Sequence, residues 1–363
     1  MDRMRLLAAA LAAALVITSC APGQTAPTPA GTATPAVAAP SPTPTPTPTP
    51  EPVTLKTGQV GGVSDAAIFL AQEKGFFAEQ GITLEVTFFA SAAQMVTPLG
   101  TGELLVGGGA SGAGLFNAMD RGVGIVIVAD KGNLNPGHGY EATLVRKDLA
   151  GVIKGPKDLK GRTIAISARN ITPEVTLDTL LRQGGLTIKD VKVVTIPHAD
   201  MLLAFQNGAI EVGLPIEPHV ARILASGVAT VLTRNDAVTP NHQTAVILYS
   251  EKLVERRDVA VRFMVAYIKG ARLYNDGFVK KDPQKRAEAI QLLAKATKLD
   301  VALFEQMVMP GIDPDGKVNE KSLLEIQEWF VAAGSQKKVV ELSKAVDLSF
   351  AAEAVRRLGG PYR

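Results

Sequence analysis

The sequence predicts an α/β protein made of two successive, similar cycles of strands and helices. Short apolar runs alternate with segments of helical spacing from residue 53 to residue 233, which is the pattern of mostly parallel sheets covered by helices. The length supports two units, because residues 53–363 exceed one domain at roughly 100–200 residues per domain. The last third of the chain has mainly helical spacing, which predicts a helical tail.

The N-terminus has the pattern of an export signal. Arg3 and Arg5 precede an apolar run over 6–17, which is too short for the ~20 residues that span a bilayer. Ile17-Thr-Ser-Cys20 resembles a bacterial lipobox, which implies cleavage before Cys20 and lipid attachment to its sulfur. Cys20 is the only cysteine, so the rest of the chain offers no disulfide, thiol nucleophile or cysteine metal site. We assign residues 1–19 to the signal peptide.

A Thr/Pro-rich tether follows over residues 20–52. This tract lacks the apolar surface to fold, and at ~3.1 Å per residue it could hold the domain about 90 Å from a membrane. The formal charge of +3 falls close to neutral without the signal, so a nucleic-acid partner has no electrostatic support. Aromatic residues make up only 5%, which argues against a carbohydrate platform, and the spacing around Trp329 predicts a packing role.

The first cycle opens on a glycine-rich loop between a strand and a helix. Val53 to Val60 predicts the strand, and Ser64 or Asp65 is a good N-cap for the helix. Unpaired amides at such a helix start suit a polar or anionic group. Further strands are expected over 83–89, 104–108, 124–130 and 142–146, with helices over 92–99 and 115–121.

The second cycle begins after the turn Asp158-Leu-Lys-Gly161. It predicts strands over 162–167, 190–197, 209–213 and 228–233, with helices over 171–183 and 200–207. A strand over 244–249 should return to the first unit. Helices are expected afterwards over 257–275, 284–297, 301–309 and 322–333, with a tight turn at 313–316.

Several motifs carry a resemblance to a known family. Gly75-Phe-Phe77, Gly81-Ile-Thr-Leu-Glu85, Asp158-Leu-Lys-Gly161 and the stretch 202–218 ending in Glu217-Pro218 resemble the periplasmic solute-binding proteins of the nitrate, sulfonate, taurine and thiamine-precursor type (SsuA/NMT1-like). Glu211 departs mildly from the family, which usually has Asp there. The resemblance covers about residues 53–273. It implies a type II-like fold of two lobes, residues 53–146 with 244–363 and residues 147–243, joined by crossing segments near 146–157 and 235–244, with the tail on the first lobe.

The resemblance also implies a function. It indicates a monomeric, lipid-anchored binding component of an ABC importer on the extracytoplasmic face, which captures a small solute by lobe closure and delivers it to a permease, without a cofactor or nucleic acid. The family's cleft is lined by loops after the sheet strands, and these correspond here to Gly61, Gly62, Ser64, Asp65, Ala90, Ser91, Ala110, Ser111, Asn133, Ala168, Arg169, Asn170 and Glu217.

An enzyme is the alternative from another class. Gly107-x-Gly-x-x-Gly112 follows an expected strand, and Asp130 ends the next strand, which together match a dinucleotide fingerprint and an oxidoreductase. The motif lies on the third strand unit, its helix is short, and an exported protein meets little NAD. The four histidines lack metal-ligand spacing, and no Gly-x-Ser-x-Gly elbow is present. We therefore expect no catalysis and no metal.

The ligand class remains open between two readings. Arg169 could clamp a sulfonate or carboxylate with its planar fork. The other candidates are mainly neutral: Ser64, Ser91, Ser111, Asn133, Asn135, Asn170, Asn241 and Gln243. A fully charged sulfonate would need more fixed positive charge than one Arg and Lys131 supply. The sequence thus favours a vitamin-like heterocycle such as riboflavin or a thiamine pyrimidine precursor, with a sulfonate, taurine or nitrate as the alternative.

Overall fold

The computed structural model describes residues 51–363. The signal peptide, Cys20 and the tether up to residue 50, all predicted above, lie outside the described residues. Within the described part of the chain, none of the helices is long and apolar enough to cross a membrane.

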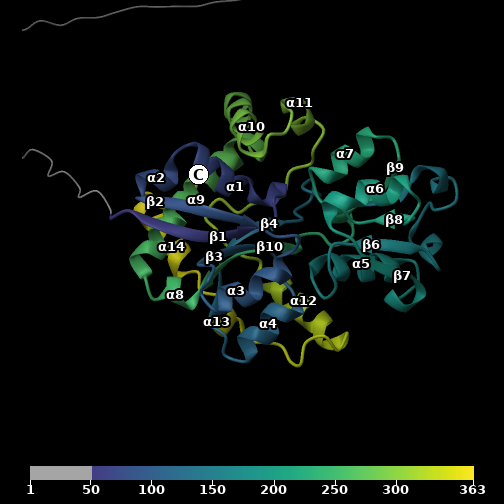
Figure 1. Ribbon diagram of the computed structural model, residues 1–363, viewed down its shortest axis with the longest axis horizontal. Helices are drawn as coiled ribbons and strands as arrows, with labels where there is room; N and C mark the ends of the chain where they lie inside the picture. The colour runs from purple at the N-terminus through teal and green to yellow at the C-terminus, as the bar shows by residue number, and fades with distance from the viewer. Residues whose placement is uncertain (1–50) are drawn as a thin grey trace, which may run out of the picture. The chain divides into compact units, whose positions relative to one another are not determined.

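The first of two five-stranded sheets has the order β2-β1-β3-β10-β4. Its strands are β1 Val53–Gln59, β2 Ile82–Phe88, β3 Val106–Ala110, β4 Ile125–Asn133 and β10 Gln243–Ser250. Strand β1 pairs in parallel with β2 and β3, whereas β10 runs antiparallel between β3 and β4. Figure 1 shows β10 within the sheet that the N-terminal strands form. The late strand therefore completes the first sheet.

The second sheet has the order β7-β6-β8-β5-β9. Its strands are β5 Ala142–Arg146, β6 Thr163–Ile166, β7 Lys192–Thr195, β8 Val212–Gly213 and β9 Ala229–Arg234. Strands β6, β7 and β8 are parallel, and β5 is antiparallel to β8 and β9.

The position of β5 corrects one prediction. The bounds predicted from the sequence put residues 142–146 in the first lobe, but this strand pairs only with strands of the second sheet. The first crossing segment is therefore residues 134–141 and not 146–157, and the second is residues 235–242, between β9 and β10. A short buried apolar strand has the same pattern in either sheet, so its composition cannot reveal which sheet it joins.

Helices cover both faces of each sheet. They are α1 Ala66–Glu73, α2 Phe76–Glu79, α3 Val96–Gly100, α4 Ala113–Asp120, α5 Thr172–Gln183, α6 Met201–Gln206, α7 His219–Ala225, α8 Glu251–Val254, α9 Arg257–Phe278, α10 Pro283–Thr297, α11 Val301–Phe304, α12 Glu320–Ala332, α13 Leu342–Ala345 and α14 Ser349–Arg357. Helices α7, α8, α13 and α14 were not predicted from the sequence, and the helix expected over 301–309 ends at Phe304.

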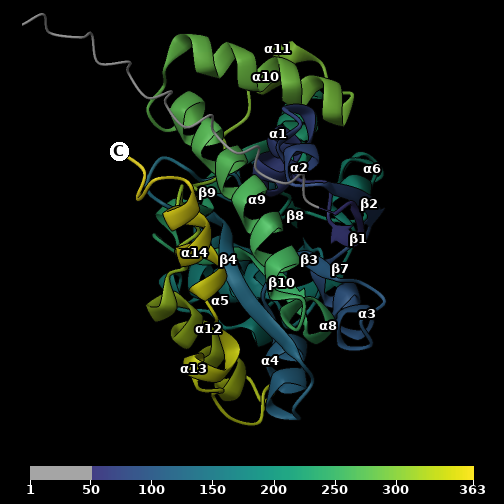
Figure 2. The same cartoon turned by 90° about the vertical axis from the view of Figure 1, so that its left-hand side faces the viewer.

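Two apolar cores lie on opposite faces of the first sheet. One gathers side chains of α1, α9, α10 and α14, and the other gathers α3, α4, α12 and α13. Figure 2 shows α9 running alongside the first sheet, with α10 above it and α12 and α13 below. The second sheet has α5 in one core and α6 with α7 in the other. The predicted fold class, two α/β lobes with a helical tail on the first, is confirmed.

A buried carboxyl group connects the tail to the first sheet. Asp130 is fully buried in β4 and accepts hydrogen bonds from the Gln243 side chain (2.6 Å), the Asp313 amide (2.6 Å) and the Gly132 amide (3.0 Å). Burial raises the pKa of Asp130 to about 7, and these donors oppose the rise. The Tyr267 hydroxyl of α9 donates to the backbone oxygen of Asp130 (2.6 Å). One residue thus joins β4, β10, α9 and the loop before α12.

A glycine in α9 lets this helix approach α1 closely. A Cβ atom at Gly270 would lie 2.1 Å from the backbone oxygen of Ala67 in α1, which is inside van der Waals contact. Gly114 in α4 is also helical, but a Cβ atom there would meet nothing within 4 Å. An added methyl group would therefore clash with α1 at position 270 but would find open space at position 114.

We predict that Gly270→Ala lowers the free energy of unfolding by about 1–3 kcal/mol, because the helices must separate. Gly114→Ala is the matched control and should raise stability by roughly 0.5–1 kcal/mol, since alanine favours a helix. Urea unfolding followed by circular dichroism measures both. Equal effects of the two substitutions would contradict this packing.

Candidate ligand-binding site

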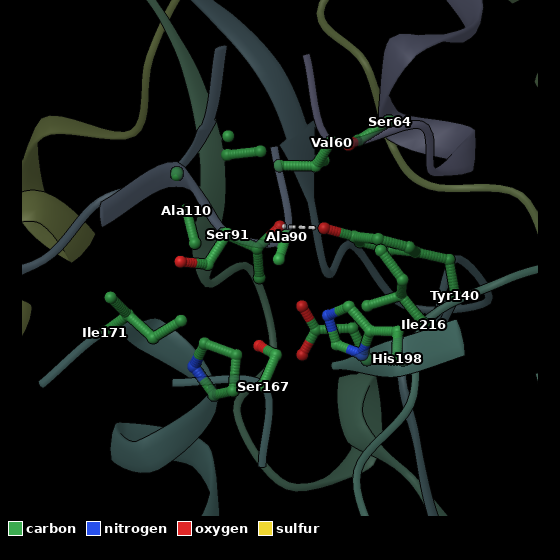
Figure 3. Close-up of a pocket in the computed structure, with 16 residues that line it drawn as sticks. Val60, Ser64, Ala90, Ser91, Ala110, Tyr140, Ser167, Ile171, His198 and Ile216 are labelled. Carbon is green, nitrogen blue, oxygen red and sulfur yellow. Dashed lines mark hydrogen bonds between the residues drawn. The ribbon is translucent and has the colours of Figure 1, made fainter. Parts of the chain in front are cut away.

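A small cavity lies between the two sheets. The first lobe contributes mainly small side chains from the ends of β1, β3 and β10 and the loop after β2: Val60, Ser64, Ala90, Ser91, Ala92, Gly109, Ala110, Thr244 and Ala245. The first crossing segment and the second lobe contribute Tyr140, Glu141, Ser167, Ile171, Pro173, His198 and Ile216. Figure 3 shows Ser91, Ala110 and Val60 on one side of this space, with Ser167 and His198 on the other.

The two lobes are in contact on both sides of the cavity. On one side the Ala113 amide donates to the Asn170 oxygen (2.9 Å), and the Thr172 amide donates to the Ser111 oxygen (3.2 Å). On the other side the Val63 amide donates to the Glu217 oxygen (3.3 Å). Backbone groups of one lobe thus satisfy those of the other, which defines a closed arrangement.

The single tryptophan joins the lobes farther from the cavity. The indole Nε1 of Trp329 in α12 donates to Asp178 Oδ2 in α5 at 2.8 Å. Asp178 also pairs with Arg182 of its own helix. The predicted packing role of Trp329 is therefore incomplete, because its polar edge spans the two lobes.

Four of the thirteen residues predicted to line the cleft line this cavity: Ser64, Ala90, Ser91 and Ala110. Ser111 lies one residue further on and is fully buried, and its hydroxyl has no hydrogen-bond partner among the described residues.

Asp65 supports the cavity wall from behind. It is fully buried, its Oδ1 lies 2.9 Å from the Nζ of Lys131, and its Oδ2 accepts from the Gly61 amide at 2.9 Å. Lys131 is also fully buried and donates to Ser64 Oγ (3.0 Å). Gly61, which has a positive φ of 73°, and Gly62 line a separate hollow beside α10 and α11. The loop glycines therefore shape the wall without facing the cavity.

The other predicted residues lie away from the cavity lining. Arg169 is bound to Glu174 (2.6 Å), and Asn170 uses its backbone oxygen for the contact between the lobes. Glu217 pairs with Arg234 (3.2 Å), and Asn133 lines a hollow beside the tail loop. The fork of Arg169, in the loop before α5, is thus held by a carboxylate of that helix.

The cavity also contains residues that the sequence analysis missed. Glu141 is buried, and its Oε2 accepts from Asn235 Nδ2 at 3.5 Å. Burial raises the pKa of Glu141 to about 7. Burial, and to a lesser extent the neighbouring His219, lowers the pKa of His198 to about 3, so this imidazole is neutral. Placing the first crossing at 146–157 hid Glu141, because residue 141 then preceded an ordinary strand.

Within residues 51–363, the cavity lacks the unpaired positive charge that an anion-binding site normally provides. In the described part of the chain, the lining includes neither Lys nor Arg. The cations nearby are paired: Lys131 with Asp65, Arg169 with Glu174 and Arg234 with Glu217. Hydroxyl groups supply most of the polar lining, and the Tyr140 hydroxyl donates to Thr244 (2.9 Å).

The motif Gly107-x-Gly-x-x-Gly112, which suggested a dinucleotide-binding enzyme, lies at a contact between the two lobes. Gly112 forms a bridge with Ile171, and a Cβ atom there would lie 2.7 Å from the Asn170 oxygen. The backbone of the second lobe thus occupies the position where a dinucleotide pyrophosphate would approach. Among residues 51–363, no cluster of three His, Cys, Asp or Glu residues has a geometry suitable for a metal ion.

Similar solved structures share this two-lobed fold. The alkanesulfonate-binding protein SsuA from Xanthomonas axonopodis pv. citri, bound to MOPS, is 20% identical over 82% of this chain and 99% of its own, with a TM-score of 0.66. The periplasmic nitrate-binding protein NrtA from Synechocystis PCC 6803 is 15% identical over 86% and 90%, with a TM-score of 0.68. The desulfurization enzyme DSZB is 19% identical over 84% and 99%, with a TM-score of 0.58.

The fold is therefore that of the periplasmic binding proteins, and it also occurs in an enzyme. The NMT1-like family matches residues 48–294. The chain belongs to the NMT1-like family. A search among curated proteins found no significant match.

We predict that Glu141→Gln weakens the pH dependence of stability. Because the pKa of Glu141 rises from 4.5 to about 7 on folding, the folded protein keeps a proton that the unfolded chain releases. The resulting stability is fully present below pH 4.5 and is lost as the pH rises through 7. The pKa of Asp130 is also raised on folding, so part of the dependence of stability on pH should remain in the variant.

Urea unfolding at intervals from pH 4 to pH 8 measures this effect. The exposed Glu85→Gln is the control and should leave the profile unchanged. Identical profiles for wild type and Glu141→Gln would contradict the buried, proton-holding carboxyl group.

Proposed function

We propose that this protein is the solute-binding component of an ABC importer. The observation that carries the proposal is the small cavity that takes its walls from both lobes and is bounded on two sides by hydrogen bonds between them. Hinge motion at residues 134–141 and 235–242 would open this cavity to solvent. A solute that contacts both lobes would favour the closed form, which a permease could then recognise.

The proposed setting is the cell envelope. Lipid attachment at Cys20 and a tether up to residue 52 would hold the lobes at the extracytoplasmic face of a membrane, as the lipobox-like sequence suggests. We propose a monomer that works without a cofactor. The ligand contacts proposed from sequence are best supported at Ser64, Ser91 and Ala110, which line the cavity.

Two ligand classes compete for the cavity. The comparisons favour the alternative class, because similar structures include binding proteins named for sulfonates and for nitrate. The lining favours a neutral or weakly charged polar solute, because it offers hydroxyl groups, a neutral imidazole and a carboxyl group without a free cation. An unpaired sulfonate would lose its hydration with little compensation there.

The size of the cavity further restricts which neutral or weakly charged solute could bind. Its volume is about 40 Å³, and a single water needs roughly 10–15 Å³ in such a cavity. A group of a few non-hydrogen atoms fits the closed form. A single-ring heterocycle of the pyrimidine type therefore suits it better than riboflavin, which would require a wider angle between the lobes.

We predict that a small polar solute stabilises the full chain without being consumed. A thermal-shift screen of pyrimidines, riboflavin, taurine, alkanesulfonates, nitrate and NAD tests this. A solute at 100 times its dissociation constant should add about 2.7 kcal/mol of stability. Trp329 is the only tryptophan and lies between the lobes, so its emission should change with the same solute.

Arg169→Ala is the matched control for the ligand class. It should leave binding unchanged, because Arg169 does not line the cavity. Stabilisation by sulfonates alone, lost in Arg169→Ala, would show that the anion class is correct. Turnover of the solute or tight NAD binding would overturn the transport function.

A further inference from the structure

We infer that Glu141 is the specificity-determining residue of the cavity and selects a solute that donates hydrogen bonds from a basic or amino nitrogen, such as an amino-substituted pyrimidine. This inference rests on the proposed function as a solute-binding protein. It adds a recognition group and its partner chemistry, and it separates this chain from binding proteins for anions.

The first support is the placement of the carboxyl group. Glu141 is only 4% exposed, yet it lines the cavity at the end of the first crossing segment. A carboxyl group removed from water needs hydrogen-bond partners to offset its lost hydration. Its side-chain donors among residues 51–363 are weak or engaged elsewhere: the Asn235 amide lies at the long distance of 3.5 Å, and the Tyr140 hydroxyl beside it donates to Thr244 (2.9 Å). A strong partner for this group is therefore missing within the described chain.

The second support is the charge balance around this carboxyl group. No Lys or Arg of the described chain forms an ion pair with Glu141, although the other buried acids near the cavity, Asp65 and Glu217, have such partners. The side chain that lacks a cation is thus the one that lines the cavity.

The third support is the chemistry around this group. His198 is neutral and its buried Nδ1 has no partner in the described chain, so it can take part in a hydrogen bond without adding charge. Ser167 lines the cavity on the same side as His198 (Figure 3). A planar nitrogen heterocycle can donate N–H groups to a carboxylate while its ring nitrogens accept from hydroxyl groups. An anion would instead face the acidic group directly.

The position of Glu141 also couples recognition to lobe closure. Asn235, its amide partner, begins the second crossing segment, and the backbone amide of Asn235 donates to the backbone oxygen of Glu141 (3.1 Å). The Thr143 hydroxyl in β5 donates to the side-chain oxygen of Asn235 (3.1 Å). A solute held by Glu141 therefore contacts the point where both crossing segments enter the second lobe.

Isothermal titration calorimetry on the full chain tests the inference. The nitrogen probes are cytosine, 4-aminopyrimidine and benzamidine, and the anion probes are taurine, methanesulfonate and nitrate. We expect at least one nitrogen probe to bind more than tenfold tighter than every anion. Glu141→Gln should weaken that binding at least tenfold, and the exposed Glu85→Gln should not change it.

Two further measurements keep the test independent of folding. The unliganded variant is checked by its unfolding midpoint. On the wild-type protein, unsubstituted pyrimidine should bind at least tenfold more weakly than 4-aminopyrimidine, because it lacks the amino donor. Equal binding of these two probes, or unchanged binding in a folded Glu141→Gln variant, would overturn the inference.

The outcome also distinguishes this inference from the proposed function. Tighter binding of an anion probe, with Glu141→Gln binding it equally or better, would overturn the role of Glu141 and leave the transport function intact. Binding of neither probe set would overturn the inference and would also count against the proposed function.

Discussion

The arrangement of the protein depends on the hydrogen bonding of β10 between β3 and β4. Because this late strand belongs to the first sheet, the chain must leave that sheet after β4 and return to it after β9. The two crossing segments follow from this constraint, and the cavity lies where they meet the strand ends. Asp130 reinforces the arrangement by joining β4, β10 and the tail loop through hydrogen bonds within the interior.

The features that determine the fold differ from those that determine which ligand binds. The two-lobed arrangement is shared with proteins that are less than 25% identical, including sulfonate- and nitrate-binding proteins and an enzyme. Ligand preference depends on the few side chains at the cavity and on their charge balance. Here the nearby basic side chains are bound to acidic ones, and the carboxyl group of Glu141 is left facing the cavity. The shared fold therefore does not decide between the ligand classes.

Sequence patterns predicted local structure better than they predicted contacts. The alternation of strands and helices was predictable, because buried strands and amphipathic helices have distinct periods. The return of residues 244–249 was expected because this strand follows the second cycle, and it pairs with β3 and β4. The assignment of β5 failed because sheet membership depends on distant pairing. Loop positions found Ser64, Ser91 and Ala110, but they could not show that Glu174 holds Arg169. Glu141 was missed because its burial beside Asn235 arises only from the tertiary fold.

The central claim is that the lobes hinge to enclose a solute, and a distance across the cleft tests it most directly. Phe88 and Leu203 are 62% and 63% exposed, on the first and second lobes respectively. Replacing Cys20 with serine leaves cysteines introduced at these two positions as the sole sites for spin labels. Pulsed electron paramagnetic resonance measures the distance between the two labels. Without solute the distribution of this distance should be broad, and it should become narrower and shift to a shorter distance when a solute that binds the protein is added. An unchanged distribution at saturating solute would contradict the account.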